Sequence, residues 1–239
     1  MLRRDGLNFR LNTKVTRAVN AGGAVKLFLD SGSGKEEEAE FDRVLVAAGR
    51  KPLVRGLGLD ELGIRLDQEG FVMVDENYRT NVPGVYAIGD LIPGPMLAHK
   101  ASAEGIAAVG RIAGLAGEVD YDSIPAVVYT YPEVASVGKT EEELKTLGAG
   151  YRSAVYPFSG TARAQCLGET DGFVKILAGS GSGRILGVHI IGPRASEMIA
   201  ECVIAIQSHM SAEELSRTVH AHPTLSEAVR ECAAMLLRR

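Results

Sequence analysis

A short apolar run that ends in a glycine and an aspartate decides the fold, and it reads Thr80-Asn81-Val82-Pro83-Gly84-Val85-Tyr86-Ala87-Ile88-Gly89-Asp90. Residues 85–88 have the composition of a buried strand, and this strand stops at Gly89. In open α/β sheets, ligands bind outside the carboxyl ends of the strands. There Gly89 would let a ligand come close, and Asp90 would accept a hydrogen bond from a sugar-type hydroxyl. On spacing alone, such an aspartate is more often a turn residue or a helix cap.

The sequence after this strand predicts a helix over residues 97–115, following the turn Pro93-Gly94-Pro95. The first turn of the helix contains Met96, Leu97, Ala98, His99 and Lys100. Unpaired backbone N–H groups and the positive end of the helix dipole favour negative charge at this point. The alternative is that His99 and Lys100 are solvated residues with no ligand.

The sequence before the strand predicts a small antiparallel sheet from residues 8–15, 24–30 and 41–48, with a polar turn over 31–40. Residues 44–48 are continuously apolar, which is typical of a buried strand. This strand would deliver Gly49 and Arg50 into a loop.

Beyond Tyr121 the sequence changes character, and we predict a second domain from about residue 121. Short β-type runs come first, at residues 126–131, 134–137, 152–158, 173–178 and 185–191. Three helices follow, at residues 195–207, 212–219 and 225–238. The Ser136-to-Thr140 segment is interpreted as a strand end followed by a helix cap.

Composition limits the classes of function. The chain has 239 residues, 46% hydrophobic and 23% charged, so it is expected to be globular. Its net charge of −4 gives no electrostatic reason to bind nucleic acid or an anionic membrane. No apolar run is long enough to span a bilayer, no signal peptide is evident, and a reducing compartment is expected. The widely spaced Cys166, Cys202 and Cys232 are interpreted as buried hydrophobic residues, and no metal site is predicted.

The sequence His220-Ala221-His222-Pro223-Thr224-Leu225-Ser226-Glu227 is the second candidate site. Pro223 biases His222 towards an extended conformation, which would project its imidazole away from the chain. Glu227 can accept the second N–H of that imidazole and support proton transfer. In the alternative interpretation, residues 224–227 form a capping box in which Glu227 bonds the cap N–H. Spacing alone slightly favours this alternative.

These motifs resemble those of the dihydrolipoamide dehydrogenases, within the pyridine-nucleotide disulfide oxidoreductases. The segment 80–90 is similar to the second flavin-binding fingerprint of the pyridine-nucleotide disulfide oxidoreductases. The segment 220–227 is nearly diagnostic of the dihydrolipoamide dehydrogenases. The resemblance extends over essentially the whole chain, including residues 46–52, 94–101, 131–138 and 171–176. It implies an acid–base dyad of His222 and Glu227, an NAD contact at Gly49, and FAD contacts at Asp90, Met96, Leu97, Ala98 and His99.

The resemblance also implies the domain organisation. We expect an α+β fold: residues 1–70 end an NAD-binding domain, residues 71–120 are a C-terminal segment of an FAD-binding domain, and residues 121–239 form an interface domain. That interface domain, an antiparallel sheet plus helices, would mediate a homodimer. The two α/β cofactor domains would be incomplete remnants, because the sequence has no GxGxxG motif and no closely spaced cysteine pair.

The intact enzyme implied by the resemblance oxidises dihydrolipoyl groups through an active disulfide and FAD to reduce NAD+. Its partner would be the lipoyl-bearing protein of a 2-oxoacid dehydrogenase complex, in the bacterial cytoplasm or the mitochondrial matrix. Because the disulfide is missing, this chain is expected to be inactive alone. The alternatives are a non-enzymatic dimerisation fragment, or the equivalent part of a related disulfide reductase such as glutathione reductase.

Overall fold

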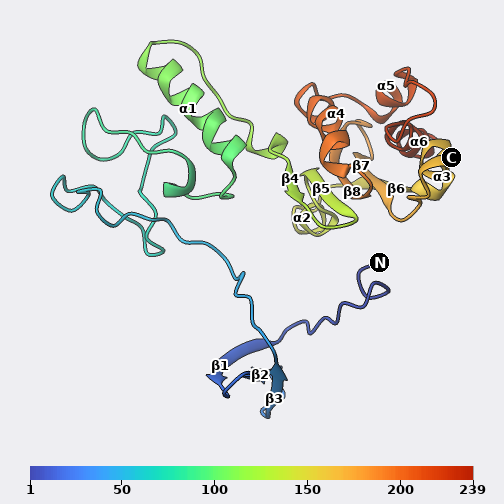
Figure 1. Ribbon diagram of the computed structural model, residues 1–239. Coiled ribbons are helices and arrows are strands. Elements are labelled where there is room, and N and C mark those ends of the chain that lie inside the picture. The colour runs from blue at the N-terminus through green and yellow to red at the C-terminus, as the bar shows by residue number, and fades with distance from the viewer. Residues whose placement is uncertain (239) are drawn as a thin grey trace. The chain divides into compact units, whose positions relative to one another are not determined.

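The computed structural model describes residues 1–238, and the chain divides into two compact units (Figure 1). The first is Met1–Lys51, and the second starts at Pro52. In the described residues no helix is both long and apolar enough to cross a membrane. The same residues contain no group of three or more His, Cys, Asp or Glu side chains that is arranged to hold a metal.

The first unit is a three-stranded antiparallel sheet in the order β1-β2-β3. Its strands are β1 (Lys14–Asn20), β2 (Val25–Asp30) and β3 (Glu36–Phe41). The expected small antiparallel sheet is therefore confirmed, and β2 contributes its buried residues, Leu27 and Leu29.

Two strand boundaries in this unit were wrong. Most of residues 8–13 precede β1 without strand structure, and β3 lies in the predicted polar turn instead of at residues 41–48. The apolar run at 44–48 forms no strand in the described chain, and its Leu45 is 90% exposed. A strand that is apolar on both faces needs neighbours on either side. The strand pairing of this unit is confined to the β1-β2-β3 sheet, so residues 44–48 have no partner strand.

The second unit begins with a largely irregular region that packs against helix α1 (Ala98–Ile112). Its predicted strand at residues 85–88 is reduced to one isolated bridge, between Arg79 and Tyr86, and a second bridge joins Leu66 to Val72. A single-turn 3-10 helix, η1 (Gly89–Leu91), follows. The region has its own apolar core, made of Ile64, Val72, Tyr78, Ala87, Ile92, Ala107 and Ala108.

The rest of the second unit is built on a five-stranded antiparallel sheet in the order β4-β5-β8-β7-β6. The strands are β4 (Ala126–Val128), β5 (Glu133–Gly138), β6 (Tyr151–Pro157), β7 (Phe173–Gly179) and β8 (Ile185–Gly192). All five predicted runs are present, although β4 is shorter than expected. The central β7 and β8 are the most buried, since both have a strand on either side and helices above them.

Helices cover this sheet (Figure 1). α4 (Ala195–Gln207) packs on β5 and β8, and α6 (Glu227–Met235) packs on β6 and β7. α5 (Ala212–Arg217) packs against α6. The buried faces of α4 and α6 join the sheet in one apolar core, so the predicted α+β architecture of this part is confirmed.

Short helices complete the unit. They are η2 (Tyr121–Ser123), α2 (Glu141–Thr146), η3 (Phe158–Gly160) and α3 (Ala162–Leu167). The helix cap predicted at Thr140 is confirmed, because its side chain and Glu143 form a capping box. α3 was missed, and Cys166 on it is exposed, contrary to the prediction of a buried residue. Six residues are too few to give a clear helical period.

Candidate active site

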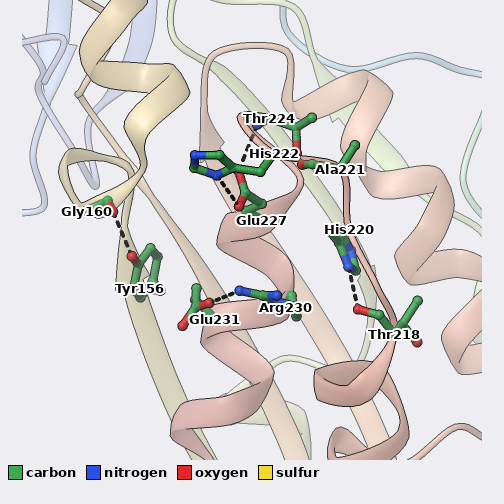
Figure 2. A network of polar contacts seen from close by, with 10 residues as sticks. All are labelled: Tyr156, Gly160, Thr218, His220, Ala221, His222, Thr224, Glu227, Arg230 and Glu231. Atoms are coloured by element: carbon green, nitrogen blue, oxygen red, sulfur yellow. Dashed lines mark hydrogen bonds and ion pairs between the residues drawn. The ribbon is translucent and has the colours of Figure 1, made fainter.

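His222 and Glu227 meet at the start of α6. The Nδ1 atom of His222 lies 2.9 Å from Oε1 of Glu227 (Figure 2). The imidazole is 70% exposed and the carboxylate side chain only 14% exposed. In the described chain, Nε2 of His222 has no hydrogen-bonding partner, so this nitrogen faces solvent. A carboxylate on one ring nitrogen and solvent on the other is an arrangement suited to proton exchange with a bound molecule.

The same carboxylate also performs the structural role that the alternative interpretation gave it. Its Oε2 accepts the backbone N–H of Thr224 at 2.8 Å. The capping box is incomplete, because the Thr224 hydroxyl donates to the carbonyl of Ala221 instead of accepting from the helix. One oxygen of Glu227 therefore fixes the loop before α6, while the other contacts His222.

Glu227 is held in its charged form. The backbone N–H of Thr224 is the largest influence that keeps the pKa of Glu227 below its ordinary value, and the hydrogen bond with His222 acts in the same direction. An ionised carboxylate accepts but does not donate a hydrogen bond, so Nδ1 of His222 carries a proton in this contact. In the neutral imidazole, Nε2 is then the nitrogen that can take up a proton.

The second candidate set lies at η1 and the start of α1. Asp90 is in η1, and Met96, Leu97, Ala98 and His99 lead into or begin α1. No side chain caps the start of α1, and the first backbone N–H groups of a helix have no partner within the helix. His99 is exposed, and its Nε2 lies 2.7 Å from the carbonyl oxygen of Pro125.

A buried ion pair that sequence reasoning missed holds this set together. Lys100 and Glu104 are one helical turn apart, fully buried, and separated by 3.1 Å from Nζ to Oε1. Glu104 Oε2 accepts the N–H of Gly89 at 2.7 Å, and Lys100 Nζ donates to the carbonyl of Gly89 at 3.1 Å. The Tyr121 hydroxyl donates to Glu104 Oε1 at 2.8 Å. Both polar groups of Gly89 are thus held by one charged pair, next to Asp90.

Glycine is required at position 89 by its surroundings. Its φ is +70°, and a Cβ there would lie 3.0 Å from the Cβ of Ala101. η1 therefore sits directly against α1, and this close approach brings Asp90 to the same end of α1 as Met96–His99. The alternative in which His99 and Lys100 are both solvated is wrong for Lys100, which is buried, whereas His99 is exposed. The spacing of Lys100 and Glu104 on an otherwise Ala-rich helix is the sequence signal that could have revealed the pair.

The residues at this end of α1 fit a flavin nucleotide. Uncapped backbone N–H groups suit the carbonyl oxygens of the ring, and the Asp90 carboxylate suits hydroxyl groups. Gly49 belongs to the first unit. It is exposed and has a φ of +71°, and a Cβ at this position would have no neighbouring atom within 4 Å, so a ligand can approach its backbone.

Sequence reasoning also missed a second histidine contact beside the dyad. The side chain of His220 is only 7% exposed, and its Nε2 lies 2.9 Å from Oε2 of Glu201 on α4. The two residues are 19 positions apart, and no local pattern indicates that they meet. In an extended segment residues two positions apart point to the same side, so the spacing of His220 and His222 gives no signal that His220 alone faces inwards.

Two family models match the chain. The model described as pyridine nucleotide-disulphide oxidoreductase matches residues 1–105, and the model of the dimerisation domain of the same family matches residues 124–233. The second match contains His222 and Glu227, and the first contains Gly49, Asp90 and Met96–His99.

Curated relatives align over almost all of the chain. Mitochondrial dihydrolipoyl dehydrogenase of Pisum sativum is 50% identical over 233 residues, which are 97% of this chain and 46% of that protein. Leghemoglobin reductase of Vigna unguiculata is 52% identical, over 97% of this chain and 45% of that protein. The chain thus spans about half the length of the curated relatives that it matches.

A solved structure has the same fold. The crystal structure of LpdA from Mycobacterium tuberculosis superposes with a TM-score of 0.88 at 28% identity, covering 98% of this chain and 50% of LpdA. Because both family models and these relatives agree along the chain, we conclude that it belongs to the pyridine nucleotide-disulphide oxidoreductases.

Proposed function

We propose that this chain supplies the acid–base dyad, part of the FAD site and the dimer interface of a dihydrolipoamide dehydrogenase. The observation that carries the proposal is the contact between His222 and Glu227, with an ionised carboxylate on Nδ1 and an exposed Nε2. The 50% identity with the pea dihydrolipoyl dehydrogenase supports a dihydrolipoyl group as the proposed substrate.

In this proposal His222 acts as the base towards a dihydrolipoyl thiol. Its Nε2 accepts the thiol proton, which leaves an imidazolium and a thiolate. Glu227 stabilises the imidazolium through Nδ1. The thiolate attacks one sulfur of a disulfide, forms a mixed disulfide and releases the other sulfur as a thiolate. The remaining dihydrolipoyl thiol gives its proton to the thiolate just released and attacks the dihydrolipoyl sulfur of the mixed disulfide. This breaks the mixed disulfide, closes the oxidised lipoyl ring and leaves the former protein disulfide as one thiol and one thiolate.

The redox disulfide of this scheme does not come from the cysteines of this chain. Cys166 is exposed, Cys202 and Cys232 are buried, and all three are free, so no two of them form a disulfide. Burial raises the pKa of Cys202 above its ordinary range and that of Cys232 to about 12, so neither forms a thiolate near neutral pH. We place the disulfide outside these 239 residues, and we expect the chain by itself to have no dehydrogenase activity.

Two cofactors are part of the proposal. Asp90 and residues 96–99 would hold FAD, which would supply the redox chemistry between the disulfide and NAD+, and Gly49 would contact the NAD. The Lys100–Glu104 pair positions η1 for this role. We keep residues 1–70, 71–120 and 121–239 as the proposed NAD-binding, FAD-binding and interface domains.

We also propose the partners and the compartment. The dimerisation model over residues 124–233 supports a homodimer through the interface domain, and the lipoyl-bearing protein of a 2-oxoacid dehydrogenase complex is the proposed electron donor. The pea relative is a mitochondrial protein, which supports the mitochondrial matrix, and the bacterial cytoplasm is the other proposed location. A non-enzymatic dimerisation fragment, or part of a glutathione-type reductase, remains the alternative.

A chimera tests the proposal. Residues 1–239 would replace the matching half of the pea enzyme, and activity would be measured with dihydrolipoamide and NAD+ beside the isolated chain with added FAD. We expect the chimera to be active and the isolated chain inactive. His222→Gln should reduce kcat/KM by about 100-fold or more, because general-base catalysis typically contributes 10²–10⁴-fold.

The matched control is His209→Gln, an exposed histidine outside the dyad, which should leave activity unchanged. A visible flavin spectrum and a dimer mass establish that each chimera is folded. A folded, flavin-loaded chimera that turns over equally well with Gln at position 222 would contradict the proposed role of His222. A chimera that reduces glutathione disulfide in preference to oxidising dihydrolipoamide would favour the alternative substrate class.

A further inference from the structure

The segment of residues 218–224 carries His222, and side-chain contacts hold it in place instead of backbone-to-backbone hydrogen bonds. The N–H of Thr218 makes the last backbone bonds to α5. Within residues 219–224, all part of the described chain, no N–H donates to a backbone carbonyl. Val219 is 92% exposed, and the imidazole of His222 is 70% exposed. The placement of His222 must therefore come from the few side chains that anchor this segment.

His220 is the inward-facing anchor. Its side chain is 7% exposed and contacts two oxygens at once. Nδ1 lies 2.9 Å from the carbonyl oxygen of Thr218, within the segment (Figure 2), and Nε2 lies 2.9 Å from Oε2 of Glu201. Because Glu201 belongs to α4, which packs on β5 and β8, the contact ties the segment to the rigid core of the interface domain.

Each of the two contacts of the His220 ring, with the Thr218 carbonyl and with Glu201, needs a proton between its two atoms. A neutral imidazole beside an ionised carboxylate supplies only one such proton. A carbonyl oxygen and a carboxylate oxygen both accept hydrogen bonds, and a neutral imidazole has only one N–H. Either the ring of His220 carries two protons, or Glu201 keeps its proton and donates it to Nε2. The other carboxyl oxygen, Oε1 of Glu201, is buried without a partner in the described chain, so His220 is the group that compensates this carboxyl.

We propose that His220 is a positioning residue for His222. Held at both ring nitrogens, His220 fixes the segment two residues before the dyad, and this keeps the imidazole of His222 within reach of Glu227. His220 itself does not touch the reacting atoms. The inference concerns the geometry of the dyad and rests on the proposed function only for its effect on catalysis.

Nitrogen NMR of the 239-residue chain with ¹⁵N-labelled histidine rings tests the positioning without any activity. The chain has five histidines, and single His→Gln variants assign their signals. The ¹⁵N shifts show which ring nitrogen carries the proton. In the wild-type chain we expect neutral His222 to hold its proton on Nδ1, facing Glu227. In His220→Ala we expect the signals of His222 to shift to those of a mixture of the two tautomers.

The control variants separate positioning from general damage. Val219→Ala removes an exposed side chain from the same segment and should leave His222 unchanged. His220→Gln keeps a donor that can reach Glu201 and should restore much of the Nδ1–H signal. If His220→Ala fails to fold, as judged by the amide signals of β7 and β8, Glu201→Ala removes the same contact from the other side and should shift the His222 signals in the same way. A folded His220→Ala or Glu201→Ala variant with the wild-type His222 signals would overturn the proposal.

The chimera with the pea enzyme supplies the catalytic test. His220→Ala should lower kcat by about 10–100-fold, because a misplaced catalytic group loses the benefit of orientation, and His220→Gln should recover part of that loss. If the wild-type chimera is inactive while His222 still responds to His220 in the NMR experiment, the proposed function fails and the positioning stands. If the chimera is active and neither readout responds to His220, only the positioning fails.

Discussion

At the scale of single residues, the carboxylate of Glu104 does most to define the candidate cofactor site. It is fully buried and accepts hydrogen bonds from Gly89 and Tyr121 in addition to its contact with Lys100. Burial raises the pKa of Tyr121 above its ordinary range, and its hydrogen bonds with Tyr78 and Glu104 act in the same direction, so its hydroxyl stays protonated. Removing one partner of a buried pair leaves an uncompensated charge, which typically costs about 3–5 kcal/mol.

We therefore expect Glu104→Gln to lower the free energy of unfolding by about 3 kcal/mol or more, measured by urea denaturation. The exposed pair of Glu213 and Arg217 has the same i,i+4 spacing, so Glu213→Gln is the matched control and should cost less than about 1 kcal/mol. The double variant Lys100→Met/Glu104→Leu should lose less stability than the sum of the single changes, because it leaves no unpaired charge. Equal losses at the buried and exposed pairs would contradict this account.

At the scale of secondary-structure elements, glutamates cap the helices that lie around the sheet. The backbone N–H of Thr140 holds the pKa of Glu143 below its ordinary value of 4.5, and the N–H of Ser211 does the same for Glu214. A carboxyl whose pKa is lowered by folding stabilises the protein above its unfolded pKa. This stabilisation is lost as the pH falls through the folded pKa.

Glu143→Gln should accordingly be less stable than the wild type at neutral pH, and the difference should shrink as the pH falls below 4.5. Glu142→Gln, in the same first turn but outside the capping box, is the control and should show little pH-dependent difference. Thermal unfolding from pH 7 to about pH 3 measures both. A difference between Glu143→Gln and the wild type that stays constant with pH would exclude the charge as the cause.

At the scale of the whole molecule, the chain is organised as two units whose boundary lies at Lys51 and Pro52. Residues around this boundary, from Arg43 to Arg55, have no strand or helix structure and are largely exposed. Trypsin should therefore cut first after Arg43, Arg50 or Arg55, and mass spectrometry should find a stable fragment that begins between residues 44 and 56. A stable fragment that begins near residue 121 would instead support an independently folding dimerisation module.

Local patterns accounted for most of the interface domain. The five strand runs and the helix at residues 195–207 follow from alternating or helical spacing of apolar residues, and both patterns survive in the structure because each element buries one face in a common core. The same reasoning failed at residues 44–48 and 85–88. Their strand-like composition becomes a strand only where a neighbouring strand exists, which composition does not show.

The sequence by itself named His222 and Glu227 as the candidate dyad, through the resemblance of residues 220–227 to a known family, whereas their spacing alone slightly favoured a capping box. The structure brings the two side chains together across one short loop. Only the tertiary structure decided what holds the sites in place. Lys100 and Glu104 form a buried pair because α1 packs against Gly89. His220 meets Glu201 because α4 packs on the same sheet as α6, the helix that follows the His220 segment. Spacing along the chain predicts contacts within a few residues, whereas burial and long-range contacts depend on how the elements pack together.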